Sequence, residues 1–229
     1  FILHKVYLLN KKFETYFKEY NFHKLYKELA NFCSLDLSAF YFDIRKDTLY
    51  CDDLLSTKRK ACINLLGLIL DIFLKWFAPI LSFTTEEIFQ IINQGKNSSI
   101  HLQAFPKIPT KWKDEKLFEK WEKFIIIRKV VNAAIEVKRS NKDIGSSLEA
   151  DVEVYLKDNY LEIVKDFDLS ENFITSKAVA KKYIKNNNSL FKLDEIEDIS
   201  VLVKKAEGKK CSRCWKIFPG PCARCETNR

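Results

Sequence analysis

The sequence predicts a mainly α-helical protein: a helical bundle, then a long helix, a small α/β unit and a cysteine-rich end. Three observations predict this fold class. Apolar residues recur at three- and four-residue steps through most of residues 1–141, as they do along one face of a helix. The chain has only 5 Gly and 5 Pro among 229 residues, too few turn signals for a many-stranded β protein. Beyond residue 148 apolar residues alternate instead, which indicates strands.

Four helices are predicted in residues 1–94. The second covers about 22–47, and the third begins at Ser56, whose hydroxyl suits an N-cap. The fourth begins at Thr84, which stands at capping-box spacing from Glu87. The first carries one apolar stripe, formed by Val6, Leu9, Phe13 and Phe17. Helices with such stripes and short connections form a bundle, which we place in residues 1–110.

The rest of the chain divides into three predicted parts. A long connecting helix occupies 111–147, with one apolar side. Residues 148–206 form a small α/β unit, because alternating segments flank a short helical one. The expected strands lie in "LEADVEVYL", "NFITSKAVA" and "ISVLVKKA", and the expected helix lies in "NYLEIVKDF". The last part, 207–229, contains four of the seven cysteines.

Composition places the chain among globular proteins, with 47% hydrophobic and 31% charged residues. No apolar run approaches the roughly 20 residues of a membrane span, so we expect no membrane partner. Three cysteines are scattered singly, which favours a reducing cytoplasm over a disulfide framework. The chain begins at Phe1 and contains no Met, which indicates a piece of a longer protein.

Positive charge gathers near the end of the chain. The formal net charge is +8, and residues 204–229 contain eight Lys or Arg against two Glu. A basic segment with an aromatic residue is typical of a surface that binds a polyanion. A solvated, lysine-rich tail is an equally good interpretation of the charge alone.

The four clustered cysteines predict a structural zinc site. They form two Cys-x-x-Cys pairs, seven residues apart, which are Cys211, Cys214, Cys222 and Cys225. Zn²⁺ prefers four thiolates in a tetrahedron, and four protein ligands leave no open position for catalysis. Two redox-active pairs, a disulfide or an iron–sulfur cluster are the alternatives. So short a segment has no core of its own, so its folding should depend on the metal.

Arg213 lies inside the first cysteine turn, and Trp215 directly follows Cys214, the last residue of that turn. An indole beside a guanidinium on a rigid turn is suited to stacking an unpaired base and binding phosphate. The alternative is that Trp215 packs onto the α/β unit as a lid. The three other tryptophans, the three histidines and the single cysteines are better explained by packing or by the surface. The sequence shows no phosphate-binding glycine loop, nucleophile elbow or catalytic metal triad.

Five segments stand in a recognisable order: "DLSAFYFDIRKDTLYCD" (36–52), "STKRKA" (56–61), "APILSFTTEEIF" (78–89), "IRKVVNAAIEVKRSNKDIGSSLEADV" (127–152) and "AEGKKCSRCW" (206–215). In this order they resemble class I aminoacyl-tRNA synthetases, and among these the isoleucyl-tRNA synthetase family. The resemblance extends over nearly the whole chain. The resemblance implies the family's anticodon-binding helical bundle and its C-terminal zinc finger. It also implies that the ATP-dependent isoleucine-activating domain and the editing domain lie upstream of Phe1, so this piece alone carries no catalytic motif.

The resemblance implies a function in tRNA recognition. The family's bundle, junction and zinc unit hold the anticodon stem-loop of isoleucine tRNA, and Arg213 and Trp215 match positions that meet splayed anticodon bases. Further possible phosphate contacts are Arg128, Lys129, Lys138 and Arg139, for which a solvated surface is at least as good an explanation. We expect one structural Zn²⁺ and a monomer whose other partners are the upstream catalytic and editing domains.

One departure and three rival interpretations stand beside this resemblance. Family fingers usually have more than seven residues between the cysteine pairs, so contacts made by the missing loop are in doubt. The rivals are a sister synthetase for valine or leucine, a formamidopyrimidine-type DNA glycosylase, and a free-standing, zinc-dependent RNA-binding protein derived from a synthetase. The four-cysteine end that follows "AEGKK" argues against the first. A glycosylase would need an N-terminal catalytic Pro, and the chain begins with Phe1.

Overall fold

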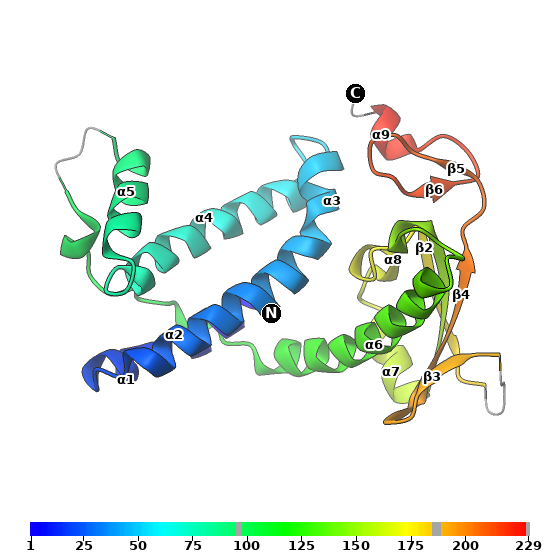
Figure 1. Cartoon of the computed structure of the whole chain (residues 1–229), viewed down its shortest axis with the longest axis horizontal. Helices are drawn as coiled ribbons and strands as arrows, with labels where there is room; N and C mark the ends of the chain where they lie inside the picture. The colour runs from blue at the N-terminus through cyan, green and yellow to red at the C-terminus, as the bar shows by residue number, and fades with distance from the viewer. Residues whose placement is uncertain (95–97, 185–188, 228–229) are drawn as a thin grey trace. The chain divides into compact units, whose positions relative to one another are not determined.

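The computed structural model describes residues 1–94, 98–184 and 189–227, which fold into two compact units (Figure 1). The first unit comprises Phe1–Leu49 and Asp53–Asp114, and the second comprises Tyr50–Asp52 and Glu115–Arg229. The predicted fold class is confirmed, because most elements are helices and one small mixed sheet lies in the second unit. The finer division into four parts stays a prediction, and Arg229 lies outside the described residues.

The first unit contains helices and loops but no strand in its described residues. Its helices are α1 (Ile2–Lys18), α2 (Phe22–Asn31), α3 (Asp43–Cys51), α4 (Thr57–Phe77) and α5 (Ser82–Ile92). A π-helical stretch, Phe32–Phe42, joins α2 to α3 where the sequence predicted one regular helix. Two short 3₁₀ turns follow α5, at Ile100–Leu102 and Thr110–Trp112. Within the described ranges, no helix combines the length and the apolar character needed to cross a bilayer.

The two predicted helix starts had different outcomes. Ser56 is the N-cap of α4, as predicted, and its Oγ accepts a hydrogen bond from the Arg59 N–H at 3.4 Å. The capping box at Thr84 is wrong, because α5 already begins at Ser82. Its early hydroxyls bond backwards along the helix instead, as with Thr85 Oγ1, which donates to the Leu81 carbonyl at 3.0 Å.

The core of the first unit is built around Trp76, which is fully buried. The Phe13 ring meets it edge to face at 4.8 Å. Its indole N–H donates to Asn10 Oδ1 at 3.0 Å, and Asn10 in turn donates to the Pro106 carbonyl at 3.2 Å. Because a buried indole N–H needs a partner, this chain of bonds permits the burial. The prediction that Trp76 is a core residue is confirmed.

The second unit packs helices against a four-stranded sheet. Its helices are α6 (Glu115–Ser140), α7 (Asp158–Val164) and α8 (Leu169–Asn172), and its strands are β1 (Ala150–Leu156), β2 (Lys177–Lys182), β3 (Phe191–Leu193) and β4 (Ile196–Lys205). The strand order is β2-β1-β4-β3. Strand β1 is parallel to β2, with α7 and α8 between them in the chain, and antiparallel to β4.

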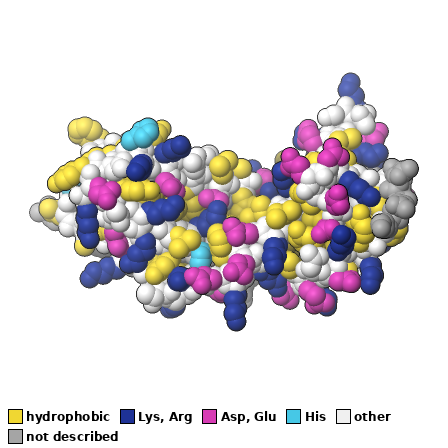
Figure 2. Space-filling view, turned by 90° about the horizontal axis from the view of Figure 1, so that it is seen from below, with side chains coloured by type: hydrophobic (Ala, Val, Ile, Leu, Met, Phe, Trp, Pro, Cys, Tyr) yellow, Lys and Arg dark blue, Asp and Glu magenta, His cyan; other side chains and the backbone are white. Residues whose placement is uncertain are grey.

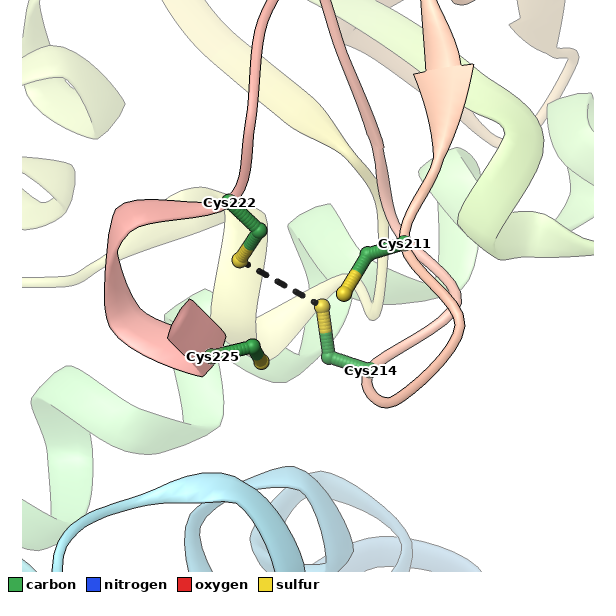
Figure 3. Close-up of side chains that lie close together, drawn as sticks. All are labelled: Cys211, Cys214, Cys222 and Cys225. Atoms are coloured by element: carbon green, nitrogen blue, oxygen red, sulfur yellow. Dashed lines mark hydrogen bonds between the residues drawn. The ribbon is translucent and has the colours of Figure 1, made fainter. Parts of the chain in front are cut away.

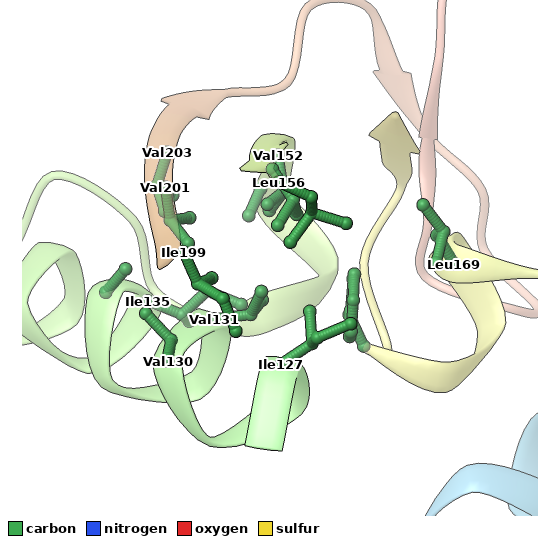
Figure 4. Close-up of a cluster of buried hydrophobic side chains, with 14 of the residues drawn as sticks. Ile127, Val130, Val131, Ile135, Val152, Leu156, Leu169, Ile199, Val201 and Val203 are labelled. Atoms are coloured by element: carbon green, nitrogen blue, oxygen red, sulfur yellow. The ribbon is translucent and has the colours of Figure 1, made fainter. Parts of the chain in front are cut away.

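The apolar face of the sheet is covered by α6 (Figure 4). Alternate residues of each strand point to this face, so Val152 and Leu156 of β1 and Ile199 and Val201 of β4 lie in one buried cluster with Val131 of α6. The sequence predicted β1, α7 and β4 at these places. It placed a strand from residue 172, whereas Asn172 still belongs to α8, a turn follows, and β2 begins at Lys177. It missed β3, which is only three residues long.

The other face of β1 is polar and links the neighbouring strands. Glu153 accepts hydrogen bonds from Lys181 of β2 at 2.7 Å, from the Tyr155 hydroxyl at 2.7 Å and from Lys204 of β4 at 3.0 Å. These donors, Lys181 foremost, lower the pKa of Glu153 to about 2. The carboxylate therefore stays charged at neutral pH and links all three strands.

Candidate metal centre and nucleic-acid surface

The four predicted metal-ligating cysteines lie together in the second unit (Figure 3). Their sulfur atoms all lie within 4.8 Å of one another, and the sulfurs of Cys214 and Cys222 are 3.9 Å apart. A tetrahedral zinc site with Zn–S bonds of about 2.3 Å would place its sulfurs about 3.8 Å apart. A disulfide needs about 2.05 Å, and all seven cysteines are free thiols. The geometry therefore suits one tetrahedral metal ion and contradicts a disulfide.

The first cysteine turn is arranged to hold a thiolate. The N–H groups of Cys214 and Arg213 donate to the Cys211 sulfur and lower the pKa of that thiol to about 7. The turn is closed by the Trp215 N–H, which donates to the Cys211 carbonyl at 3.0 Å, and by the Cys211 N–H, which donates to the Lys216 carbonyl at 2.9 Å. Donors aimed at sulfur favour its charged form, which is the form that binds metal.

Burial acts in the opposite direction on the neighbouring ligands. It raises the pKa of the Cys214 thiol and of the Cys225 thiol above the ordinary value. Without a cation these two groups therefore hold their protons at neutral pH. A bound metal ion would supply the positive charge that makes four close thiolates compatible, and its binding would release protons.

A small hairpin carries the cysteine turns. Strands β5 (Lys209–Lys210) and β6 (Ile217–Phe218) pair antiparallel, and α9 (Ala223–Thr227) contains the last cysteine. Before β5, Gly208 has φ +127°, and a Cβ there would lie 2.0 Å from the Phe218 carbonyl oxygen. Only glycine fits such a close approach. The sequence analysis did not single out Gly208, although a glycine between charged residues is a turn signal.

Ser176 ties this hairpin to the α/β unit. Its Oγ accepts a hydrogen bond from the Ile217 N–H at 2.6 Å and donates one to the Leu148 carbonyl. A single hydroxyl thus bridges the hairpin and the segment that leads into β1. The residue was missed by sequence reasoning, and no local pattern marks a serine 41 residues away from its partner.

The indole of Trp215 is exposed at the first cysteine turn. Its side chain is 59% exposed, so the structure does not bury it as a lid. Its backbone φ is +65°, in the left-handed region that disfavours bulky residues and favours glycine. The turn therefore exposes an aromatic ring at a position where the backbone conformation favours glycine, which has no side chain.

Arg213 lies in the same turn, at the edge of a groove. Its Nη2 donates to the Tyr50 carbonyl at 3.1 Å, within the second unit. The groove has a volume of about 500 Å³, and its lining includes Lys209, Lys210 and Phe218. The two lysines entered the sequence analysis only as part of the charge count. They are the further cations that the fold places beside Arg213.

The four predicted contacts on α6 have protein partners. Arg128 is half-buried, and its Nε donates to the Asn172 carbonyl at 2.9 Å, which links α6 to α8. The others lie near carboxylates: Lys129 near Glu195 at 3.7 Å, Lys138 near Asp143 at 2.9 Å and Arg139 near Glu136 at 2.8 Å. Figure 2 likewise shows Lys and Arg interspersed with Asp and Glu on one face. That these four residues bind RNA stays a prediction.

Comparisons with known proteins relate the chain to tRNA ligases. The family described as the anticodon-binding domain of tRNA ligase matches residues 1–156. The isoleucine–tRNA ligase of Pelagibacter ubique is 50% identical over 224 residues, 98% of this chain and 23% of that protein. That of Rhodopseudomonas palustris is 41% identical over 206 residues, 88% of this chain and 20% of the relative. The chain thus spans less than a quarter of the length of these relatives.

The contact at Gly208 gives a test of the hairpin. We expect Gly208→Ala to disrupt β5 and β6, because the added Cβ would overlap the Phe218 carbonyl, and to weaken Zn²⁺ binding in a chelator competition. Gly220→Ala is the matched control, since a Cβ at Gly220 meets nothing within 4 Å. Equal Zn²⁺ affinity of the two variants would contradict the role given to Gly208.

Proposed function

We propose that the chain binds the anticodon stem-loop of an isoleucine tRNA, because it belongs to the tRNA ligase family as the anticodon-binding part of an isoleucine–tRNA ligase. Its contribution is recognition. Charging of the tRNA with isoleucine, at the expense of ATP, is proposed for the rest of the parent ligase, as is editing. The match over residues 1–156 removes the DNA glycosylase alternative, and the isoleucine-specific relatives argue against a sister synthetase. The third alternative, a free-standing RNA-binding protein, would bind the same proposed ligand.

One observation supports this proposal most directly: the exposed indole of Trp215 on the cysteine turn. Every base has a planar face, so an aromatic ring that cannot retreat into a core suits an unpaired anticodon base. Arg213, Lys209 and Lys210 lie at the adjoining groove and would attract the phosphates on either side. Stacking then supplies the contact with the base, and the cations supply salt-dependent affinity for the backbone.

The metal is proposed to be one structural Zn²⁺ bound by the four cysteine sulfurs. Four soft ligands within 4.8 Å of one another match the preference of zinc for a closed tetrahedral thiolate site. Bound zinc would hold the two turns in a fixed relation and would leave no position for a reactive water. Its task here is therefore to fix the direction of Trp215 and Arg213.

The contribution of this chain to the reaction of the parent ligase is to position the tRNA. Contacts between this chain and the anticodon would supply binding energy. That energy would help to orient the distant acceptor end of the tRNA in an active site elsewhere in the parent ligase. This division places chemistry and recognition on different parts of one protein, which we propose to be cytoplasmic and monomeric.

Metal removal tests the structural assignment. We expect the chain to bind one Zn²⁺, measured by metal analysis, and to lose the hairpin on chelation, since strands of two residues each have little else to hold them. Helical circular dichroism should persist, because the helical core of the first unit and the helix–sheet core of the second are formed by other residues. A visible absorption band typical of an iron–sulfur cluster, or wholesale loss of helicity, would contradict the assignment.

Anticodon replacement tests the function itself. The zinc-loaded chain should bind an isoleucine tRNA transcript at least about tenfold more tightly than the same transcript with another anticodon, at one fixed salt concentration. Filter binding or fluorescence anisotropy measures both affinities. Equal affinities would show a basic platform that does not read the anticodon.

Substitution at Trp215 tests the stacking role. Trp215→Gly removes the ring at a position whose φ of +65° suits glycine, so the turn and its Zn²⁺ affinity should be preserved. Binding of isoleucine tRNA should weaken by about 1–3 kcal/mol, the range for one lost base stack. Trp215→Phe, which keeps a ring, is the control and should retain most of the affinity. If both variants bind like the unaltered chain, Trp215 does not contact RNA.

A further inference from the structure

Helices α1 and α2 are joined by a short turn (Figure 1). This turn carries a second exposed aromatic residue. Tyr20 follows the end of α1, has φ +55° and is 80% exposed. Two hydrogen bonds close the helix end around it: the Tyr20 N–H donates to the Phe17 carbonyl at 3.2 Å, and the Asn21 N–H donates to the Tyr16 carbonyl at 2.8 Å. Glycine is the usual residue at the left-handed position of this motif.

A chain of ring contacts supports Tyr20 from the core outward. Phe17 meets Phe105 at 5.2 Å and Phe22 at 6.0 Å between ring centroids, and Phe22 meets Tyr20 at 6.3 Å, all edge to face. The inner rings border the core of the first unit, whereas Tyr20 stands in solvent. This support lowers the entropy lost when an exposed ring binds a partner.

Two exposed lysines lie close to these aromatic residues in the chain. Phe22 and Tyr26, four residues apart, share one side of α2, and Lys27 follows Tyr26 directly. Lys18 ends α1. Among the described residues no carboxylate lies within ion-pair distance of Lys18 or Lys27, while the nearby Glu28 pairs with Lys12 at 3.0 Å. Glu19 is the acidic residue beside Tyr20. The surface thus combines exposed rings with cations that lack an ion-pair partner.

We propose that Tyr20, Phe22 and Tyr26, with Lys18 and Lys27, form a second RNA-binding surface, the α1–α2 aromatic surface, which stacks unpaired nucleotides of the bound tRNA. The inference rests on the proposed function for the identity of the ligand. Rings at three positions offer stacking faces, and the two lysines supply the charge complementary to phosphate. A protein partner fits less well, because burying unpaired lysines against it is unfavourable.

The decisive variant is Tyr20→Gly. It removes the ring yet gives the helix end the residue its φ favours, so the melting temperature should stay equal or rise. Affinity for isoleucine tRNA should fall at least about fivefold, the lower end of the effect of one lost stack. Phe83→Ala is the matched control, because Phe83 is 92% exposed on α5 and lies outside the proposed surface. Equal affinity of the unaltered chain and Tyr20→Gly would overturn the proposal.

Two further measurements identify the contact. Each of Lys18→Gln and Lys27→Gln should reduce the slope of log affinity against log salt by about 0.7, the value per phosphate contact with a single strand. Ultraviolet cross-linking of the complex, followed by trypsin and ribonuclease, should give a nucleotide adduct on the peptide 19–24, which holds Tyr20 and Phe22. Unchanged slopes and adducts confined to the cysteine hairpin would reject the proposal.

These outcomes are separable from the proposed function. If the unaltered chain fails to discriminate the two anticodons, the proposed function fails. If it discriminates them and the Tyr20 and lysine variants do the same with unchanged affinity, only the α1–α2 aromatic surface is rejected, and its rings are then assigned to a protein partner such as the rest of the parent ligase.

Discussion

The closeness of four sulfur atoms is the constraint on which the end of the chain depends. Strands β5 and β6 have two residues each, and the buried cluster that includes this segment consists of cysteines with Phe218 at its border. Such a segment gains too little from apolar burial to offset the entropy of ordering it. A metal ion bound by the four thiols would supply the missing stabilisation, and the single hydroxyl of Ser176 links the hairpin to the α/β unit.

Backbone strain and exposure together distinguish the two aromatic positions. A left-handed conformation disfavours a residue with a Cβ by about 1–2 kcal/mol, and both Trp215 and Tyr20 adopt it while largely exposed. The conformation alone is not informative, because Lys142 adopts it after α6 and Ile174 adopts it half-buried. An exposed ring in that conformation gains little from packing. Retaining it is understandable where the ring binds something outside the chain.

The helices and strands that could be predicted from the sequence are those with a repeated apolar pattern. Helix α1 and strand β1 each bury one face, and the apolar residues of that face recur over several residues. This repetition made both elements recognisable in the sequence. Features set by one or two residues were missed or misplaced: the start of α5, strand β3 and the π-helical stretch. Each depends on tertiary packing that single-residue signals do not encode.

The same distinction applies to the site. The cluster of four cysteines was predictable because their spacing is local in the chain. The bridge from Ser176 to Ile217 joins distant segments and has no local signal. The aromatic position at Tyr20 was missed because a left-handed turn is recognised from glycine, and this turn has none. The sequence analysis also treated the four cations of α6 as equivalent candidates for phosphate contacts, whereas their surroundings in the structure differ.

That difference decides how each α6 cation can serve RNA binding. Lys129, Lys138 and Arg139 lie in exposed ion pairs, which contribute little to stability, so phosphate can replace the carboxylate at small cost. Arg128 is half-buried and satisfies the Asn172 carbonyl between α6 and α8. Withdrawing it would leave that acceptor without this donor and loosen the packing of the two helices. Arg128 therefore suits a supporting role in the fold, and the three exchangeable cations are the better candidates for meeting the tRNA backbone.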